Sequence, residues 1–273
     1  MNLSVSARSV ENELNTGRMD LCDFLDLCFI KNVLNVELPA RLIRDDEHLL
    51  TVKHHIDEMG MNVSAYSINC DFLSKGHRHE DEISSFMKAI ENADQLGTAI
   101  IHVSNGEMVS SVDLDKAIDT VISSLVQCCE QAERKGISIV LENRGVLALT
   151  SGQIRRIIEA INKSNIKASM AISSFEKVNE SPVDAIYHLN DLVGYVQVDV
   201  IKSAGSGGVG TALNGLNALS TIYDDNPVEL SSIFTALHDI HYGGYLSIVN
   251  EGGSNQVFNT RSGIDYVRGF MTK

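Results

Sequence analysis

In the stretch Ser138–Arg144, an apolar, strand-like run is followed by three polar residues. They are Glu142, Asn143 and Arg144, which carry a carboxylate, an amide and a guanidinium. A charge at the end of a buried strand is costly unless another group pairs with it. In parallel α/β proteins, ligands bind at the carboxyl ends of the strands. Glu142 is therefore the first candidate for a general base or a ligand contact.

Other expected strands carry polar residues at alternate positions, and barrel strands alternate between the helix layer and the interior. In the second strand Leu34, Val36 and Leu38 are expected to face the helices, which turns Glu37 inward. The same alternation in the remaining strands predicts one set of inward residues around a single opening. Its members are Glu37, His102, Glu142, Gln197, Asp199 and Glu251.

This set is compatible with more than one chemistry. Carboxylates and a histidine together can hold a divalent metal. Carboxylates and amides can also accept hydrogen bonds from the hydroxyls of a polyol. Several members could equally be solvated loop acids, and a lone inward His102 could be a hydrogen-bonded structural residue.

Short β-rich runs alternate along the chain with longer segments of helical period. The expected strands are 3–7, 33–38, 62–69, 99–104, 138–143, 167–172, 194–200 and 245–250. Helices are expected over 20–30, 49–59, 80–96 and 113–135, and Gly60, Gly97 and Gly136 follow three of them as C-cap glycines. The alternation predicts a (β/α)8 TIM barrel, since an open sheet would show a glycine-rich turn where Ser6–Ser9 stands. No linker interrupts residues 1–273, so a single domain is expected.

The composition of the chain limits which classes of partner and which cellular compartment are expected. The 273 residues are 44% hydrophobic and carry a formal net charge of −14, which disfavours nucleic acid as a partner. No apolar run reaches the ~18 residues of a membrane span, and Met1–Ser4 lack the basic start and following apolar core that are typical of a signal peptide. Together with five cysteines without metal-ligand spacing, these features favour a cytoplasmic protein. A homo-oligomer is compatible with the sequence.

Four motifs resemble those of the xylose isomerase-like TIM-barrel superfamily of sugar isomerases and epimerases. They lie in the fifth to eighth expected strands, and segments 3–6 and 35–38 also resemble the first two strands of that family. The motifs are Val140–Asn143, Lys167–Phe175, Tyr195–Asp199 and Gly243–Gly252.

The resemblance implies a divalent-metal site with ligands at 142, 171, 197 and 249. Only Glu142 keeps a ligand type, because Ala171, Gln197 and Val249 replace the expected Asp, His and Glu. One carboxylate does not hold a divalent ion tightly, so we expect at most a weakly bound Mn²⁺, Mg²⁺ or Zn²⁺. Loss of oxyanion stabilisation costs about 3 kcal/mol or more, so the ordinary metal mechanism is expected to be impaired.

Three functions remain open. The first is a sugar isomerase or epimerase homologue that binds a carbohydrate or sugar phosphate at the barrel mouth. The second is a catalytically inactive sugar-binding pseudoenzyme that serves as a sensor or partner subunit. The third is a metal-independent lyase or dehydratase with Glu142 as base and Arg144 or Lys202 as anion clamp. The expected substrate-binding residues are Glu37, His102, Asn143, Arg144, Gln197, Asp199 and Glu251.

A glycine-rich segment, Gly205–Gly210, follows the seventh expected strand. Its backbone N–H groups could cradle a phosphate. No Lys-Ser/Thr follows it, so it is not a P-loop, and a lid over the barrel mouth is the alternative interpretation.

Overall fold

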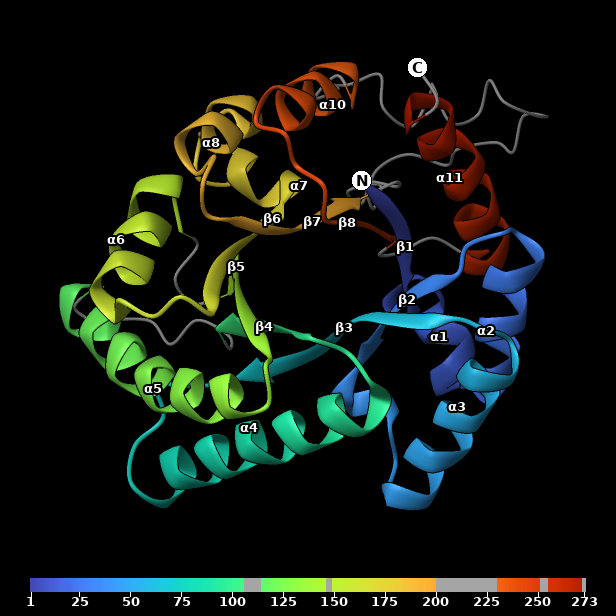
Figure 1. The fold of residues 1–273 in the computed structure, drawn as a ribbon, viewed down its shortest axis with the longest axis horizontal. Helices are drawn as coiled ribbons and strands as arrows, with labels where there is room; N and C mark the ends of the chain where they lie inside the picture. Colours follow the sequence, from blue (N-terminus) through green and yellow to red (C-terminus); the bar gives the residue numbers. More distant parts are fainter. Residues whose placement is uncertain (106–113, 146–148, 200–229, 251–254, 272–273) are drawn as a thin grey trace.

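The computed structural model describes residues 1–105, 114–145, 149–199, 230–250 and 255–271. Eight parallel strands pair in sequence order, and β8 pairs with β1 to close a barrel (Figure 1). This confirms the predicted (β/α)8 TIM barrel. The strands are β1 Asn2–Ser6, β2 Asn35–Pro39, β3 Asn62–Cys70, β4 Ile100–Asn105, β5 Ser138–Gly145, β6 Ile166–Ala171, β7 Val193–Asp199 and β8 Tyr245–Val249.

Helices surround this barrel on all sides in the view of Figure 1. The α-helices are α1 Glu11–Asn15, α2 Leu21–Ile30, α3 Asp46–Glu58, α4 His77–Leu96, α5 Leu114–Arg134, α6 Ser151–Ile161, α7 Ile172–Glu176, α8 Pro182–His188, α10 Leu230–Asp239 and α11 Gln256–Met271. Two 3₁₀ helices, η1 Ala7–Val10 and η2 Ala40–Leu42, follow β1 and β2. None of the helices in the described ranges is both long and apolar enough to cross a bilayer.

Local sequence explains where several helices begin and end. Asp20 starts α2 with a capping box, in which its side chain and that of Asp23 bind each other's backbone N–H. Thr150 and Gln153 form the same arrangement at the start of α6. Gly97 ends α4 at a φ of 75°, the left-handed conformation that favours glycine.

At most strand positions, the residues face the helix layer or the barrel interior as predicted. Ile139 and Leu141 are buried in the core that includes the helices, whereas Val140 belongs to a separate small cluster with Ala65 and Tyr195. The prediction for Leu34 is wrong. Because β2 begins at Asn35, Leu34 precedes the strand and is 44% exposed.

Strand β7 contains one irregularity that affects the site above it. Its register against β6 shifts between Ala168 and Ser169, so that Val193 and Tyr195 pair with neighbouring residues and Gly194 lies between them. A Cβ atom at Gly194 would lie 2.6 Å from Lys167 Cβ and 2.9 Å from Val140 Cγ1. Only glycine fits at this bulge without displacement of its neighbours.

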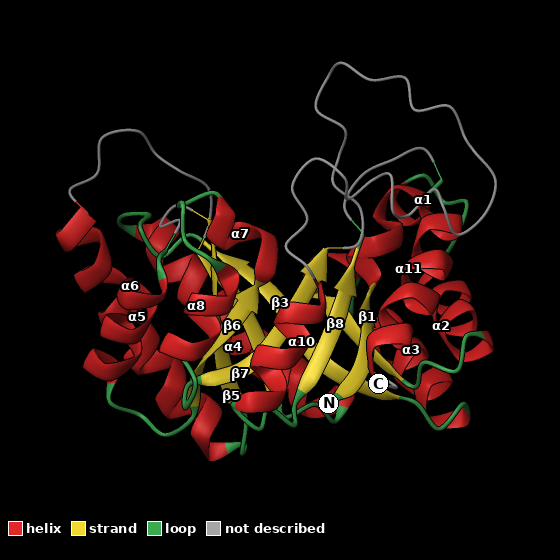
Figure 2. Ribbon diagram, turned by 90° about the horizontal axis from the view of Figure 1, so that it is seen from above, coloured by secondary structure: helices red, strands yellow, loops and turns green. Residues whose placement is uncertain are grey.

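The strands point toward one end of the barrel, and the N-terminus lies at the opposite end (Figure 2). Helix α7 lies at the end to which the strands point, because it begins at Ile172 directly after β6. The ends of the strands that carry Glu142 and Asp199 therefore lie at the same end of the barrel.

Candidate functional site

The barrel interior contains a layer of polar side chains from the even-numbered strands. Glu37, His102, Ser169 and Ser247 come from β2, β4, β6 and β8, and none is more than 2% exposed. His102 Nε2 lies 2.8 Å from Ser169 Oγ, and Ser247 Oγ donates to Glu37 at 2.9 Å. Barrel interiors are usually filled by layers of bulky branched residues from alternate strands, so this layer is unusually polar.

Glu37 is the centre of this network. Gln197 Nε2 lies 3.0 Å from each Glu37 carboxylate oxygen, and the Tyr195 hydroxyl donates to Glu37 at 3.3 Å. Burial alone would raise the pKa of Glu37. Attraction to His102 and Arg8 and the hydrogen bonds from Gln197 and Ser247 outweigh that effect, so the pKa lies below its usual value. Glu37 is a buried, ionised carboxylate.

Tyr195 lies below this layer and links it to β1 and β3. Its hydroxyl lies 2.9 Å from Ser64 Oγ, which in turn lies 2.7 Å from Ser4 Oγ. Burial first, and the negative charge of Glu37 second, raise the pKa of Tyr195 well above its usual value. Tyr195 therefore keeps its proton and acts as a hydrogen-bond donor to Glu37.

Glu142 lies near the carboxyl end of β5 and is 1% exposed. Its Oε1 lies 3.3 Å from Arg144 Nε, at an ion-pair distance, but this oxygen accepts no hydrogen bond within the described chain. Arg144 also lies near Asp199, with Nη2 3.7 Å from Oδ1, and its Nε donates to Ser174 Oγ at 3.4 Å. One guanidinium thus lies between carboxylates from β5 and β7.

The structure places most predicted site residues in or next to this opening. Glu37, His102, Glu142 and Gln197 are buried, and the side chains of Arg144 and Asp199 are 20% and 14% exposed. Ser173 donates a hydrogen bond to Asp199. Three predicted features, Glu251, Lys202 and the Gly205–Gly210 segment, lie outside the described residues.

Asn143 is engaged with the backbone of β6. Its Nδ2 donates to the carbonyl oxygen of Ala171 at 3.2 Å, and its Oδ1 accepts from the N–H of Ala171 at 2.9 Å. The side chain is 1% exposed. Both ends of the amide thus tie β5 to β6, and the substrate-binding role expected for Asn143 stays a prediction.

Strand alternation places Tyr195 and Ser247 inward, but neither is among the expected site residues, and no facing is predicted for Ser169. The same alternation could have found Ser169, since it shares parity with Ala171 on β6. Their residue types gave no signal, because serine and tyrosine are also common at structural positions. Ser173 and Ser174 follow β6 and could not be assigned by strand parity.

The side chains at the implied metal-ligand positions do not fit the divalent-metal site that the family resemblance implies. Ala171 and Val249 are buried and apolar, and the Gln197 amide group donates to Glu37. The remaining carboxylate, Glu142, already lies beside the positive charge of Arg144. No group of three or more His, Cys, Asp or Glu side chains suited to a metal ion occurs in the described ranges.

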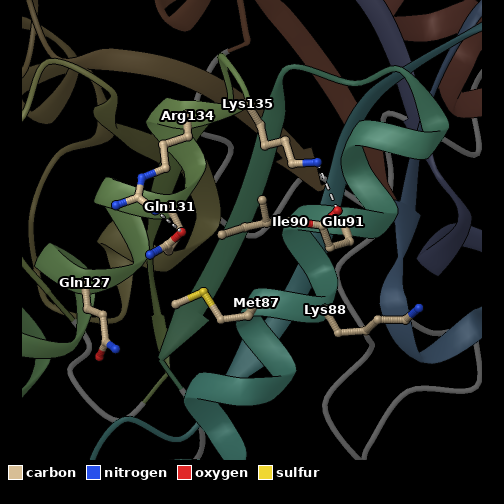
Figure 3. A pocket seen from close by; sticks show the side chains of 8 residues that line it. All are labelled: Met87, Lys88, Ile90, Glu91, Gln127, Gln131, Arg134 and Lys135. Carbon is tan, nitrogen blue, oxygen red and sulfur yellow. Dashed lines mark hydrogen bonds and ion pairs between the residues drawn. The ribbon is translucent and has the colours of Figure 1, made fainter.

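A separate groove lies on the outer surface, between α4 and α5 (Figure 3). Met87, Ile90 and Glu91 line it from α4, and Gln131 and Lys135 line it from the other side. Lys135 Nζ is bound to Glu91 at 3.0 Å and to Asp94 at 2.8 Å. The groove contains none of the inward strand residues, and ligands of this fold bind at the carboxyl ends of the strands. We therefore place the candidate site at the barrel mouth.

Solved structures share this fold at low sequence identity. D-psicose 3-epimerase from Clostridium cellulolyticum H10, in a structure with D-tagatose, superposes with a TM-score of 0.78 at 13% identity, covering 99% of both chains. IolI with a bound zinc atom gives 0.78 at 13% identity, over 100% of this chain and 97% of that one. The probable 3-DHS dehydratase AsbF from Bacillus anthracis gives 0.77 at 14%, over 98% and 99%.

No curated protein sequence matches the chain. The family model described as a xylose isomerase-like TIM barrel matches residues 22–269, which is most of the chain. The protein therefore belongs to the xylose isomerase-like TIM-barrel family.

Proposed function

We propose that this protein binds a sugar or sugar phosphate at the barrel mouth and acts on it as an isomerase without a divalent metal. The observation that carries the proposal is the Glu142 carboxylate. It is 1% exposed, and one oxygen lacks a hydrogen bond within the described chain. A buried carboxylate with an unused acceptor is costly in a purely structural role, whereas a general base needs a free acceptor oxygen within hydrogen-bond reach of the proton that it removes.

Isomerisation, rather than epimerisation, fits the residues at hand. Glu142 removes the proton from the carbon next to the carbonyl and returns it to the neighbouring carbon on the same face, while a hydroxyl proton moves to the carbonyl oxygen. Epimerisation needs proton donors on both faces. At the position of the second carboxylate implied by the family resemblance stands Val249, which is buried and apolar.

Arg144 is the described group best placed to stabilise the enediolate. Its Nε lies 3.3 Å from Glu142 Oε1, so its charge lies beside the proposed base. Donors aimed at developing negative charge typically contribute about 3 kcal/mol to a reaction barrier. The guanidinium of Arg144 would supply this stabilisation where the metal ligands have been replaced.

A sugar-binding protein without turnover is the second candidate. The apolar side chains of Ala171 and Val249 favour this candidate. Both are buried at implied ligand positions, and neither can transfer a proton or stabilise a charge. Binding would then depend on the same polar groups at the mouth, and Glu142 would accept a hydroxyl hydrogen bond rather than a proton.

Deuterium incorporation distinguishes the two candidates. Aldoses, ketoses and their phosphates are incubated with the protein in D₂O and with EDTA, and ¹H NMR follows exchange next to the carbonyl. We expect exchange and aldose–ketose conversion that fall ~10²–10⁴-fold in Glu142→Gln. Glu58→Gln, at an exposed position on α3, is the matched control. Ligand binding with neither exchange nor conversion would favour the sugar-binding protein, and loss of water from the substrate would indicate a lyase.

A further inference from the structure

Glu37 holds the Gln197 side chain in one of its two amide orientations. Gln197 Nε2 lies 3.0 Å from both oxygens of Glu37. A carboxylate group that is ionised can only accept hydrogen bonds, and Tyr195 and Ser247 also donate to Glu37. The NH₂ group must therefore face Glu37, and the carbonyl oxygen of Gln197 points away from it.

That carbonyl oxygen and one oxygen of Glu142 are both buried acceptors without a hydrogen bond in the described part of the chain. Each side chain belongs to a residue that is 1% exposed. Buried acceptors of this kind are rare in folded proteins, since an unmade hydrogen bond costs about 1–3 kcal/mol. Both acceptors lie on interior strands of the barrel, where a bound ligand could supply the donors.

The strand registers place these acceptors at the same height in the barrel. Ser247 pairs with Ser4, and Glu37 pairs with Ser6, so the Ser247–Glu37 hydrogen bond joins positions offset by two residues across β8, β1 and β2. Glu142 pairs with Ser169, and Ser169 pairs with Tyr195. A step of two residues along β7, equal to the offset found between β8 and β2, leads from Tyr195 to Gln197. Glu142 and Gln197 therefore share one interior layer of the barrel.

We propose that Gln197 Oε1 and Glu142 Oε1 form an acceptor pair that recognises hydroxyl groups of a polyol, with Glu37 as the positioning residue. The inference rests on sugar binding at the barrel mouth and assigns the contacts that select the ligand. A hydroxyl brings a donor without a charge. A cation is disfavoured, because the Arg144 guanidinium already lies beside Glu142.

Xylitol tests this pair apart from catalysis, because it presents hydroxyls but has no carbonyl to isomerise. Calorimetric titration of xylitol compares the wild type with Gln197→Met, which keeps the length of the side chain but removes the acceptor. We expect binding about tenfold weaker in Gln197→Met. Gln127→Met, at an exposed position on α5, is the matched control and should bind as the wild type does. Equal binding by the wild type and Gln197→Met, or no binding of xylitol at ~0.1 M, overturns the proposal.

A reciprocal swap tests the positioning role of Glu37. In Glu37→Gln, both amides can rotate, so we expect xylitol binding to weaken severalfold. The double variant Glu37→Gln/Gln197→Glu lets the new amide donate to a carboxylate at 197, which restores an acceptor at unchanged net charge. We expect binding to return toward the wild-type value. If the double variant folds by circular dichroism but binds no better than Glu37→Gln, Glu37 does not position the acceptor.

Failure of this inference can be told from failure of the isomerase proposal. Xylitol binding that depends on Gln197, without deuterium exchange or aldose–ketose conversion of any sugar, keeps the acceptor pair and overturns the isomerase. Exchange that depends on Glu142, with the same KM and kcat in Gln197→Met, keeps the isomerase and overturns the acceptor pair.

Discussion

The side-chain nitrogen of Gln197 lies 3.0 Å from each carboxylate oxygen of Glu37, across the interior of the barrel. The contact joins β2 to β7 and places an ionised carboxylate where no solvent reaches it. A buried charge is tolerated only where hydrogen bonds and opposite charge offset its desolvation. Tyr195, Ser247 and Gln197 supply the hydrogen bonds, and this requirement fixes the orientation of each of them.

The free energy of unfolding should depend on pH through the ionisation of Glu37. Its pKa is lowered in the folded protein from a usual value of 4.5, so the stabilisation is present above that value and is lost as the pH falls through the folded pKa. We expect the free-energy difference between wild type and Glu37→Gln to be constant from about pH 7 to pH 5 and to shrink below pH 4.5. Urea unfolding at each pH measures this difference. A difference that grows on acidification would contradict the ionised state of Glu37, and Glu58→Gln controls for loss of one negative charge.

Asn143 is expected to act on stability rather than on ligand affinity. Asn143→Ala leaves the buried N–H and carbonyl of Ala171 without their partners, which should cost about 1–3 kcal/mol in the free energy of unfolding. Asn143→Asp keeps only the acceptor and sets a carboxylate oxygen against the Ala171 carbonyl, so it should also destabilise. Urea unfolding measures the stability of each variant, and titration with xylitol measures its ligand affinity. Normal stability with lost xylitol binding would return Asn143 to the substrate-binding residues.

Several parts of the site follow from sequence alone, because strand alternation is a local property. The apolar neighbours Ile139 and Leu141 fix Glu142 as inward, and the same rule places Gln197 and Glu37. The orientation of the Gln197 amide could not be predicted, since its partner lies 160 residues earlier in the chain. The position of Leu34 could not be predicted in this way, because alternation does not mark the residue at which a strand begins.

Gly194 should not tolerate a side chain. A Cβ there would lie 2.6 Å from Lys167 Cβ and 2.9 Å from Val140 Cγ1, so β6 or the small interior cluster would have to move. We expect Gly194→Ala to lower the free energy of unfolding by about 1–3 kcal/mol. Gly243→Ala is the control, because no atom lies within 4 Å of the Cβ it would add. Equal thermal unfolding midpoints for the two variants would show that the bulge in β7 relaxes without cost.

Arg144 and Glu142 should be energetically coupled. Removal of the guanidinium in Arg144→Met leaves the buried Glu142 carboxylate without the ion pair seen at 3.3 Å, so the single variant should be destabilised. In Glu142→Gln/Arg144→Met no uncompensated charge remains at 142, and we expect a coupling free energy of about 0.5–3 kcal/mol from the double-mutant cycle. Urea unfolding of the wild type, both single variants and the double variant gives this value. Strict additivity would mean that other groups neutralise Glu142.

Restoration of the replaced ligands should create a metal site on the same strands. The variant Ala171→Asp/Gln197→His/Val249→Glu adds two carboxylates and an imidazole at the carboxyl ends of β6, β7 and β8, next to Glu142. These are the ligand types that hold Mn²⁺ and Zn²⁺. We expect sub-equimolar Mn²⁺ binding by the wild type, measured by calorimetry, and clearly tighter binding by the triple variant. Addition of Glu142→Gln to the triple variant should weaken its binding again.

If the triple variant binds no better while remaining folded, the correspondence of positions 171, 197 and 249 with ligand positions is wrong. Equimolar Mn²⁺ on the wild type, lost in Glu142→Gln, would instead refute the metal-free mechanism, because Arg144 would then have to leave the carboxylate to a metal ion.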